Sequence, residues 1–136
     1  MVKPIMRDAF FLNQKSEEAT RVDLPVAQDL EDTLKANRER CVGMAANMIG
    51  YRKRIIIVAT GLADMVMINP VITEKSEPYE TEEGCLSLPG VRKTTRFQKI
   101  TVRYLDKKFA EHTQSFSGYI AQIIQHECDH LEGVLI

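Results

Sequence analysis

Apolar residues recur at helical spacing in two stretches of the chain, one in its first third and one near its end. In the first stretch, residues 24–40, charged residues separate a set of apolar positions, namely Leu24, Ala27, Leu30 and Leu34. Positions three or four apart share one face of a helix, so this spacing predicts an amphipathic helix that ends near Arg40. The second stretch begins at Ser117, and its apolar stripe continues to Leu131. It predicts a largely buried helix, with Gly133 placed to end it.

Between the predicted helices, the pattern changes to short apolar runs. Residues 54–60 and 65–73 are apolar and partly β-branched, which is typical of buried strands, and we expect them to pair as a hairpin. Residues 99–106 alternate apolar and polar positions, as a half-buried strand does. Residues 41–50, with small side chains, suit close backbone approach rather than a helix, and residues 77–91 are expected to be rich in turns.

These elements predict an α+β fold in which several strands surround one long C-terminal helix. The sequence has no internal repeat, low-complexity tract or linker, so we expect one domain over residues 1–136. With 18 basic and 19 acidic residues, the chain has no global charge to attract nucleic acid or a membrane surface. No apolar run approaches the roughly 20 residues of a membrane span, and the start lacks the apolar core of a secretory signal. A cytoplasmic location is expected.

The sequence QHECDH at residues 125–130 indicates a metal site. On a helix, His126 and His130 project from one face four residues apart, within reach of one cation, and Glu127 lies beside them as a candidate base. A catalytic site of this kind normally has three protein ligands and leaves a position for water. A third ligand is therefore required.

The third ligand is expected upstream of the helix. Ile136 stands where one common extension of this pattern has its last histidine, and isoleucine cannot bind a metal. The upstream candidates are Cys85, His112 and carboxylates such as Glu83. We favour Cys85, because a thiolate binds borderline or soft cations strongly and its segment is flanked by glycine. His112 has the surroundings of an exposed turn residue.

Three short motifs, in this order and spacing, resemble those of the peptide deformylase family. They read CVGMAANMIG at 41–50, EGCLSLPG at 83–90 and QHECDHLEG at 125–133, and the similarity extends over essentially the whole chain. The resemblance implies a peptide-deformylase-like fold, with antiparallel or mixed strands packed around the HExxH helix.

The resemblance also implies a function, which is hydrolysis of the N-formyl group of nascent polypeptides that begin with formyl-methionine. It assigns one divalent metal ion to Cys85, His126 and His130, usually Fe(2+), with Zn(2+), Ni(2+) or Co(2+) as substitutes. Glu127 would act as general acid and base, while the backbone N–H of Leu86 would stabilise the oxyanion. Gly43 belongs to the same catalytic region. The ribosome, near its exit tunnel, is an expected partner.

One position departs from the family pattern. Met48 occupies the place of a glutamine whose side chain helps to hold the oxyanion in the family, and a thioether has no N–H to donate. Loss of one such donor costs about 100- to 1000-fold in rate. Reduced activity is therefore one expectation, and an alternative is a catalytically impaired relative that binds metal and peptide as a regulatory protein. Gln122, one turn before His126, is a candidate replacement donor.

Several other residues have competing interpretations. Glu83 and Asp129 are candidates to orient the ligand imidazoles, although a surface role suits Asp129 nearly as well. Arg92 aligns with a basic residue that the family places near the substrate, and a solvated arginine is an equal alternative. Cys41 and Cys128 are expected to be small buried residues rather than reactive thiols.

Overall fold

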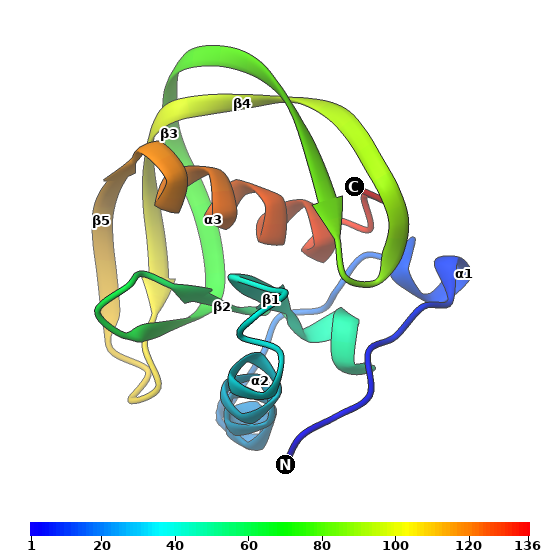
Figure 1. The fold of residues 1–136 in the computed structure, drawn as a ribbon. Coiled ribbons are helices and arrows are strands. Elements are labelled where there is room, and N and C mark those ends of the chain that lie inside the picture. Colours follow the sequence, from blue (N-terminus) through cyan, green and yellow to red (C-terminus); the bar gives the residue numbers. More distant parts are fainter.

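One antiparallel sheet in the order β1-β2-β3-β4-β5 forms the frame of the computed structural model, which describes residues 1–136 (Figure 1). Successive strands of the chain are neighbours throughout the sheet, so each connection is a hairpin. The elements in chain order are α1 (Ala9–Leu12), the 3-10 turn η1 (Arg21–Asp23), α2 (Leu24–Ala36), β1 (Gly43–Ala45), the 3-10 turn η2 (Ala46–Ile49), β2 (Ile55–Ala59), β3 (Asp64–Cys85), β4 (Leu88–Leu105), β5 (Glu111–Ser117) and α3 (Gly118–Leu131). The expected α+β class is confirmed, with antiparallel strands throughout.

The short strand β2 lies at the centre of the core, with a helix on each side. Successive side chains of a strand point to opposite faces. Ile55 and Ile57 accordingly belong to the cluster that packs against α2, whereas Ile56 and Val58 belong to the cluster that packs against α3. Because both faces of β2 are buried, its sequence is a continuous apolar run rather than an alternation of apolar and polar residues. The hairpin predicted between residues 54–60 and 65–73 is present as β2 and β3.

The strands β3 and β4 continue far beyond this core as a long two-stranded ribbon. In Figure 1 the ribbon arches over α3 and returns, so that the turn between the strands lies near the last turns of that helix. Pairing runs from Ile68 opposite Leu105 to Cys85 opposite Leu88, with register shifts that bend the ribbon. The residues between the last pair, Leu86 and Ser87, form what we call the hairpin tip. The tip therefore meets the C-terminal helix although it lies far from it in sequence.

The C-terminal helix α3 is buried along most of its length, as its apolar stripe predicts. It ends at Leu131, and Gly133 follows with a left-handed φ of 77°, which a residue with a side chain rarely adopts. A Cβ on Gly133 would lie 2.6 Å from the backbone oxygen of Asn13, so the close approach of the N-terminal segment also requires glycine there. None of the helices is both long and apolar enough to span a bilayer.

Three local expectations were wrong. The helix α2 ends at Ala36, not near Arg40, because the side-chain amide of Asn37 donates to the carbonyl of Thr33 at 2.8 Å and the chain then turns. Residues 46–49, which were not expected to be helical, form the 3-10 turn η2. Residues 77–91, expected to be rich in turns, are strand on both sides of the hairpin tip.

Candidate metal centre

The ends of two elements bring three ligand groups together. His126 and His130 lie one turn apart on α3, and Cys85 is the last residue of β3. The Nε2 atoms of the two imidazoles are 3.1 Å apart, and Sγ of Cys85 lies 3.3 Å from Nε2 of His130. All three ligand atoms lie within 4.8 Å of one another. The three residues predicted as metal ligands thus converge on one point.

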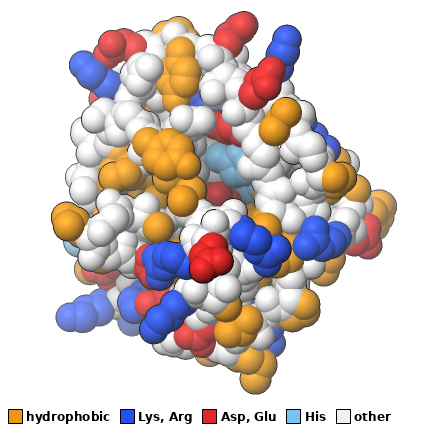
Figure 2. Space-filling model, in the orientation of Figure 1, with side chains coloured by type: hydrophobic (Ala, Val, Ile, Leu, Met, Phe, Trp, Pro, Cys, Tyr) orange, Lys and Arg blue, Asp and Glu red, His pale blue; other side chains and the backbone are white.

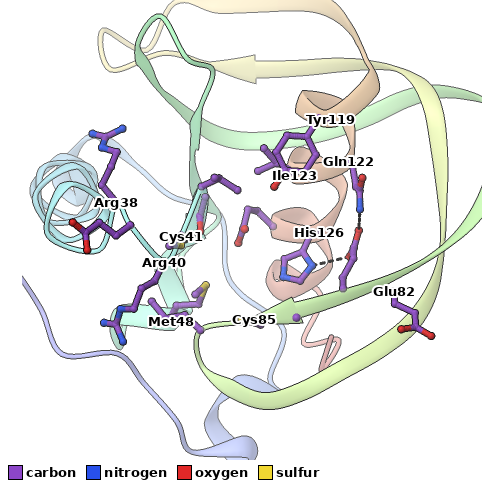
Figure 3. Close-up of a pocket in the computed structure, with 17 residues that line it drawn as sticks. Arg38, Arg40, Cys41, Met48, Glu82, Cys85, Tyr119, Gln122, Ile123 and His126 are labelled. Atoms are coloured by element: carbon purple, nitrogen blue, oxygen red, sulfur yellow. Dashed lines mark hydrogen bonds and ion pairs between the residues drawn. The ribbon is translucent and has the colours of Figure 1, made fainter.

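The long ribbon is what delivers the cysteine to the helix. Because β3 and β4 arch over α3, the hairpin tip lies against the helix face that carries the histidines (Figure 3). The backbone N–H of Ser87 donates to Sγ of Cys85 at 3.4 Å, which holds the sulfur in place at the end of β3. Cys85 is partly exposed, whereas both histidines are buried. The cysteine therefore forms the solvent side of the centre.

A buried carboxylate orients the first histidine. Oε1 of Glu83 lies 2.8 Å from Nδ1 of His126, so that nitrogen carries its proton toward the carboxylate and Nε2 is directed at the other ligands. Arg96, only 4% exposed, donates to both oxygens of Glu83 and, at 2.6 Å, to Asp129. Glu83 therefore plays the orienting role expected of it, while Asp129 acts on Arg96 rather than on an imidazole.

The pKa values in this cluster follow from burial and from these contacts. Burial opposes ionisation of Glu83, but hydrogen bonds from His126, Arg96 and Gln122 outweigh it and lower the pKa of its carboxyl to about 2. Burial also lowers the pKa of His130 to about 3, so this ring stays neutral, as a ligand must be. For His126, burial disfavours the charged ring, yet hydrogen bonds with Cys85 and Glu83 raise its pKa to about 10. A cation bound by these ligands would take the place of that proton.

The donor set fits a divalent metal. One thiolate and two imidazole nitrogens, held by separate elements, form a compact set of the soft and borderline donors that bind zinc-type and iron-type cations. The ligand atoms are packed closely enough for bonds of about 2.0–2.3 Å to a shared ion. Glu83 supplies the support that a metal-bound imidazole requires.

Glu127 projects beside this centre from the same helix. Its side chain is buried, and Oε1 makes no hydrogen bond within the protein. Burial raises the pKa of the Glu127 carboxyl to about 7, which places it in the range where it can both accept and return a proton near neutral pH. Gly43 leaves room for it, since a Cβ there would lie 3.1 Å from Oε2 of Glu127 and 2.7 Å from Cγ2 of Ile123.

These groups open into a cavity of about 490 Å³. Figure 2 shows a hollow with a pale blue histidine at its base, and charged side chains gather along one part of its border. The lining residues come from α3, the segment before β1, the turn η2 and the end of β3, and include Gly43, Met48, Leu86, Gln122 and Glu127. The cavity is large enough for a small part of a peptide, and two of the candidate ligands, Cys85 and His126, are among the residues that line it.

The two side-chain amides near the position of the missing glutamine both donate to other groups of the protein. Met48 lines the cavity, 1% exposed, and its sulfur accepts a hydrogen bond from the N–H of Ala45 at 3.4 Å. The amide of Asn47 donates to the carbonyl of His130 at 2.9 Å. The amide of Gln122 donates to Glu83 at 2.9 Å (Figure 3). The role of replacement donor that the sequence suggested for Gln122 is therefore not supported by its contacts.

The remaining candidates lie at varied distances from the centre. Cys41 lines the cavity and Cys128 packs against the core, and burial raises the pKa of each thiol to about 12, so neither behaves as a thiolate. Arg92 is not among the residues that line the cavity, and its contact is with the carbonyl of Pro89. His112 lies on β5 beside Asp106, away from the metal ligands.

Two residues of the network had no sequence signal of their own. Arg96 lies thirteen positions after Glu83 on the opposite strand, and the two meet because the hairpin folds back at the tip. Tyr79 donates to Oε1 of Gln122 at 3.3 Å across 43 positions. The strand register pairs Glu83 with Arg92 and Arg96 with Tyr79, so the contact of Arg96 with Glu83 is diagonal across the ribbon and no sequence spacing points to it.

Comparisons with known proteins agree with this fold and centre. The family model described as polypeptide deformylase matches residues 3–136. A protein of Clostridium beijerinckii named peptide deformylase is 59% identical over 136 residues, covering all of both chains. A solved Met-Ala-Ser-bound peptide deformylase of Acinetobacter baumannii has a TM-score of 0.88 at 31% identity, covering 99% of this chain and 97% of that one. The Thermotoga maritima peptide deformylase has a TM-score of 0.89 at 30% identity, covering 99% and 95%. This chain belongs to the peptide deformylase family.

Proposed function

We propose that this protein removes the N-formyl group from nascent polypeptides that begin with formyl-methionine, using a divalent cation held by Cys85, His126 and His130. The convergence of these three ligand groups within 4.8 Å, beside a buried carboxylate that faces a cavity, carries the proposal. When bound, the cation supplies Lewis acidity, which lowers the pKa of a water molecule toward neutrality. The protein's own groups perform the remaining work.

Fe(2+) is the cation that we propose for the protein in the cell, with Zn(2+), Ni(2+) and Co(2+) as substitutes. A mixed set of one sulfur and two imidazole donors suits all four of these ions, and none of them requires the oxygen-rich surroundings that calcium or magnesium needs. The metal in the cell then depends on availability as well as on the ligands.

Glu127 is the proposed general base and general acid. It takes the proton of the attacking water and passes it to the nitrogen of the leaving amine when the formyl C–N bond breaks. Its unpaired Oε1 is available for this proton, and the buried position that raises its pKa to about 7 keeps both protonation states accessible. The absence of a Cβ at Gly43 allows Glu127 to occupy this position against β1.

Leu86 is the proposed oxyanion donor. Its side chain packs against the core, and the residue lines the cavity next to Cys85. The backbone N–H of Leu86 would donate to the formyl oxygen as negative charge develops there. Such donors are most effective when they are already aimed at the transition state, so the hairpin tip must be held firmly.

The cavity suits a peptide that starts with an apolar side chain. Ile123 and Met48 are nearly buried apolar residues in the lining, and Tyr119 stands exposed on the helix turn above them (Figure 3). The related deformylase with Met-Ala-Ser bound supports a methionyl peptide as the ligand class. We propose that the protein acts in the cytoplasm, near the ribosomal exit tunnel, where formylated chains emerge.

The alternative of a catalytically impaired regulatory relative is not favoured. A relative that is 59% identical over the whole chain is named peptide deformylase, and the Cys/His/His group is complete. The methionine at position 48 removes one oxyanion donor, but the candidate metal ligands and Glu127 are all present.

Hydrolysis of formyl-Met-Ala-Ser by protein loaded with Fe(2+) or Ni(2+) tests this proposal, together with metal content. Cys85→Ala and His130→Ala are expected to lose bound metal, whereas Glu127→Gln should retain it and lose at least about 100-fold in kcat. Arg103→Met, on the exposed face of β4, serves as the surface control. Unchanged metal stoichiometry in both ligand variants would refute the ligand assignment, and full activity of Glu127→Gln would refute the base.

A further inference from the structure

The hairpin tip that carries Leu86 is joined to the N-terminal segment. The guanidinium of Arg7 donates from Nη1 to the backbone carbonyl of Leu86 at 3.0 Å, across 79 positions of sequence. Figure 1 shows the turn between β3 and β4 beside the N-terminal segment that leads into α1. A residue outside the three family motifs therefore contacts the residue whose N–H is the proposed oxyanion donor.

The neighbouring residues attach this segment to the other side of the site. The backbone N–H of Met6 donates to the carbonyl of Met48 at 2.7 Å, and Ile5 packs against the core cluster that includes Met48. Met48 and Leu86 both line the cavity. Residues 5–7 therefore form a short bridge, fixed to η2 by Met6 and to the hairpin tip by Arg7.

The tip needs such a bridge because of its place in the ribbon. Leu86 and Ser87 lie beyond the last strand pair, and the register is irregular between Gly84 and Cys85. The ladder does not continue there, so the position of the tip depends on side-chain packing, on the N–H of Ser87 that donates to Sγ of Cys85, and on the contact from Arg7. Displacement of about 1 Å in a catalytic group can lower a rate roughly 100-fold.

We propose that Arg7 is a positioning residue, which holds the hairpin tip so that the N–H of Leu86 stays aimed into the cavity. Arg7 touches neither the ligand residues nor the cavity, so it acts through Leu86. The role rests on the proposed function of Leu86. Because the guanidinium is exposed, the expected effect is moderate, about 3- to 10-fold in kcat, and much smaller than that of a group that touches the substrate.

The test compares Arg7→Met, which keeps the side-chain length and loses the donors, with Arg7→Lys, which can donate one hydrogen bond. Metal-loaded proteins are assayed for kcat and KM on formyl-Met-Ala-Ser, and amide hydrogen exchange is followed in peptides that cover residues 85–88. Arg7→Met should lower kcat about 3- to 10-fold with KM within about twofold, and it should speed exchange at the tip. In Arg7→Lys, kcat and the exchange rate at the tip should lie between those of wild type and Arg7→Met. In Arg103→Met, neither quantity should differ from wild type.

Unchanged kcat and unchanged exchange in Arg7→Met would overturn the proposal. So would a general rise in exchange across the core with a matching fall in Tm, because that result indicates a structural role alone. If the wild-type protein does not turn over the peptide, the proposed function fails, and the exchange comparison still decides whether Arg7 holds the tip. In that case, faster amide exchange of Arg7→Met that is confined to residues 85–88, with an unchanged Tm, supports the role of Arg7 in holding the tip.

Discussion

The side-chain amide of Gln122 donates a hydrogen bond to Oε2 of Glu83 at 2.9 Å. Tyr79 donates to the other end of the same amide, which fixes its orientation so that the NH₂ group faces the carboxylate. Since Glu83 also contacts Nδ1 of His126, Gln122 supports a proposed metal ligand through the carboxylate. Its place one turn before His126 on α3 serves this contact instead of oxyanion binding.

Replacement of Gln122 by methionine should weaken metal binding. The change removes the amide and keeps a side chain of similar volume, so Glu83 loses one of its donors. Direct loss of a group that orients a ligand costs about 10- to 100-fold in affinity, and Gln122 lies one contact further away. We expect the dissociation constant to rise about 3- to 10-fold in competition with a chelator. Gln98→Met, at an exposed position on β4, is the matched control, and equal affinities in the two variants would contradict the expectation.

Replacement of Met48 by glutamine should raise the rate. The side chain lines the cavity close to Leu86, and an amide there adds an N–H donor where the chain otherwise supplies only backbone. Because an oxyanion donor acts in the transition state, kcat should increase by at least about tenfold while KM changes little. Steady-state kinetics on formyl-Met-Ala-Ser measures both constants.

The control for this change is Met65→Gln, at a partly buried position of β3 outside the cavity. It reports the general cost of placing an amide where a thioether was. Equal kcat in wild type and Met48→Gln would show that Met48 is not the limiting departure from the family pattern.

A methyl group at Gly43 should impair both stability and catalysis. The added Cβ would lie 2.7 Å from Ile123 and 3.1 Å from Glu127, so α3 must shift away from β1. Overpacking of this kind costs about 1–3 kcal/mol in unfolding free energy, and the shift displaces the proposed base. Gly43→Ala should therefore unfold at lower urea concentration and lose activity. Gly84→Ala is the control, since the atom nearest to a Cβ there is the backbone oxygen of Gly90 at 3.4 Å. A similar loss of stability in this variant would argue against the steric explanation.

Glu83 makes the stability of the protein depend on acid pH. Its carboxyl has a pKa of about 2 in the folded protein, below the ordinary glutamate value of 4.5, so the folded state favours the ionised form. The resulting stabilisation is fully present above about pH 4.5 and is lost as the pH falls from there toward about 2. Urea unfolding across this range should show a steeper loss for wild type than for Glu83→Gln. If the unfolding free energies of the two proteins fell in parallel with pH, the lowered pKa assigned to Glu83 would be contradicted.

The sequence predicted the parts of the fold whose apolar residues are regularly spaced. The helix over residues 118–131 has such a pattern because one face of it is buried, and the strand β2 was recognisable as a continuous apolar run because both of its faces are buried. The inner parts of β3 and β4 were predicted as strands, but the outer part of their ribbon was not, since it is paired only with itself and many of its side chains are exposed. Its glutamate, proline and glycine residues are of types that strands generally disfavour, and they pointed to turns instead.

The site was predictable to the extent that its chemistry is local. His126, Glu127 and His130 share one helix, and the choice of Cys85 followed from the chemistry of thiolates and the family resemblance. Arg96, Tyr79 and Arg7 act across hairpins or from the N-terminal segment, and no spacing rule connects them to the centre. Their contacts follow from the register and bend of one ribbon.

The separation of the ligands along the chain gives the centre a further property. Cys85 and His130 lie 45 positions apart, with β4, β5 and most of α3 between them. An ion bound by both closes that whole length of chain into a ring, so unfolding requires its release, and free ion at 100 times its dissociation constant adds about 2.7 kcal/mol to the work of unfolding. During synthesis, a chain that ends before α3 possesses a single ligand. Metal capture can therefore occur only after the last helix has been made.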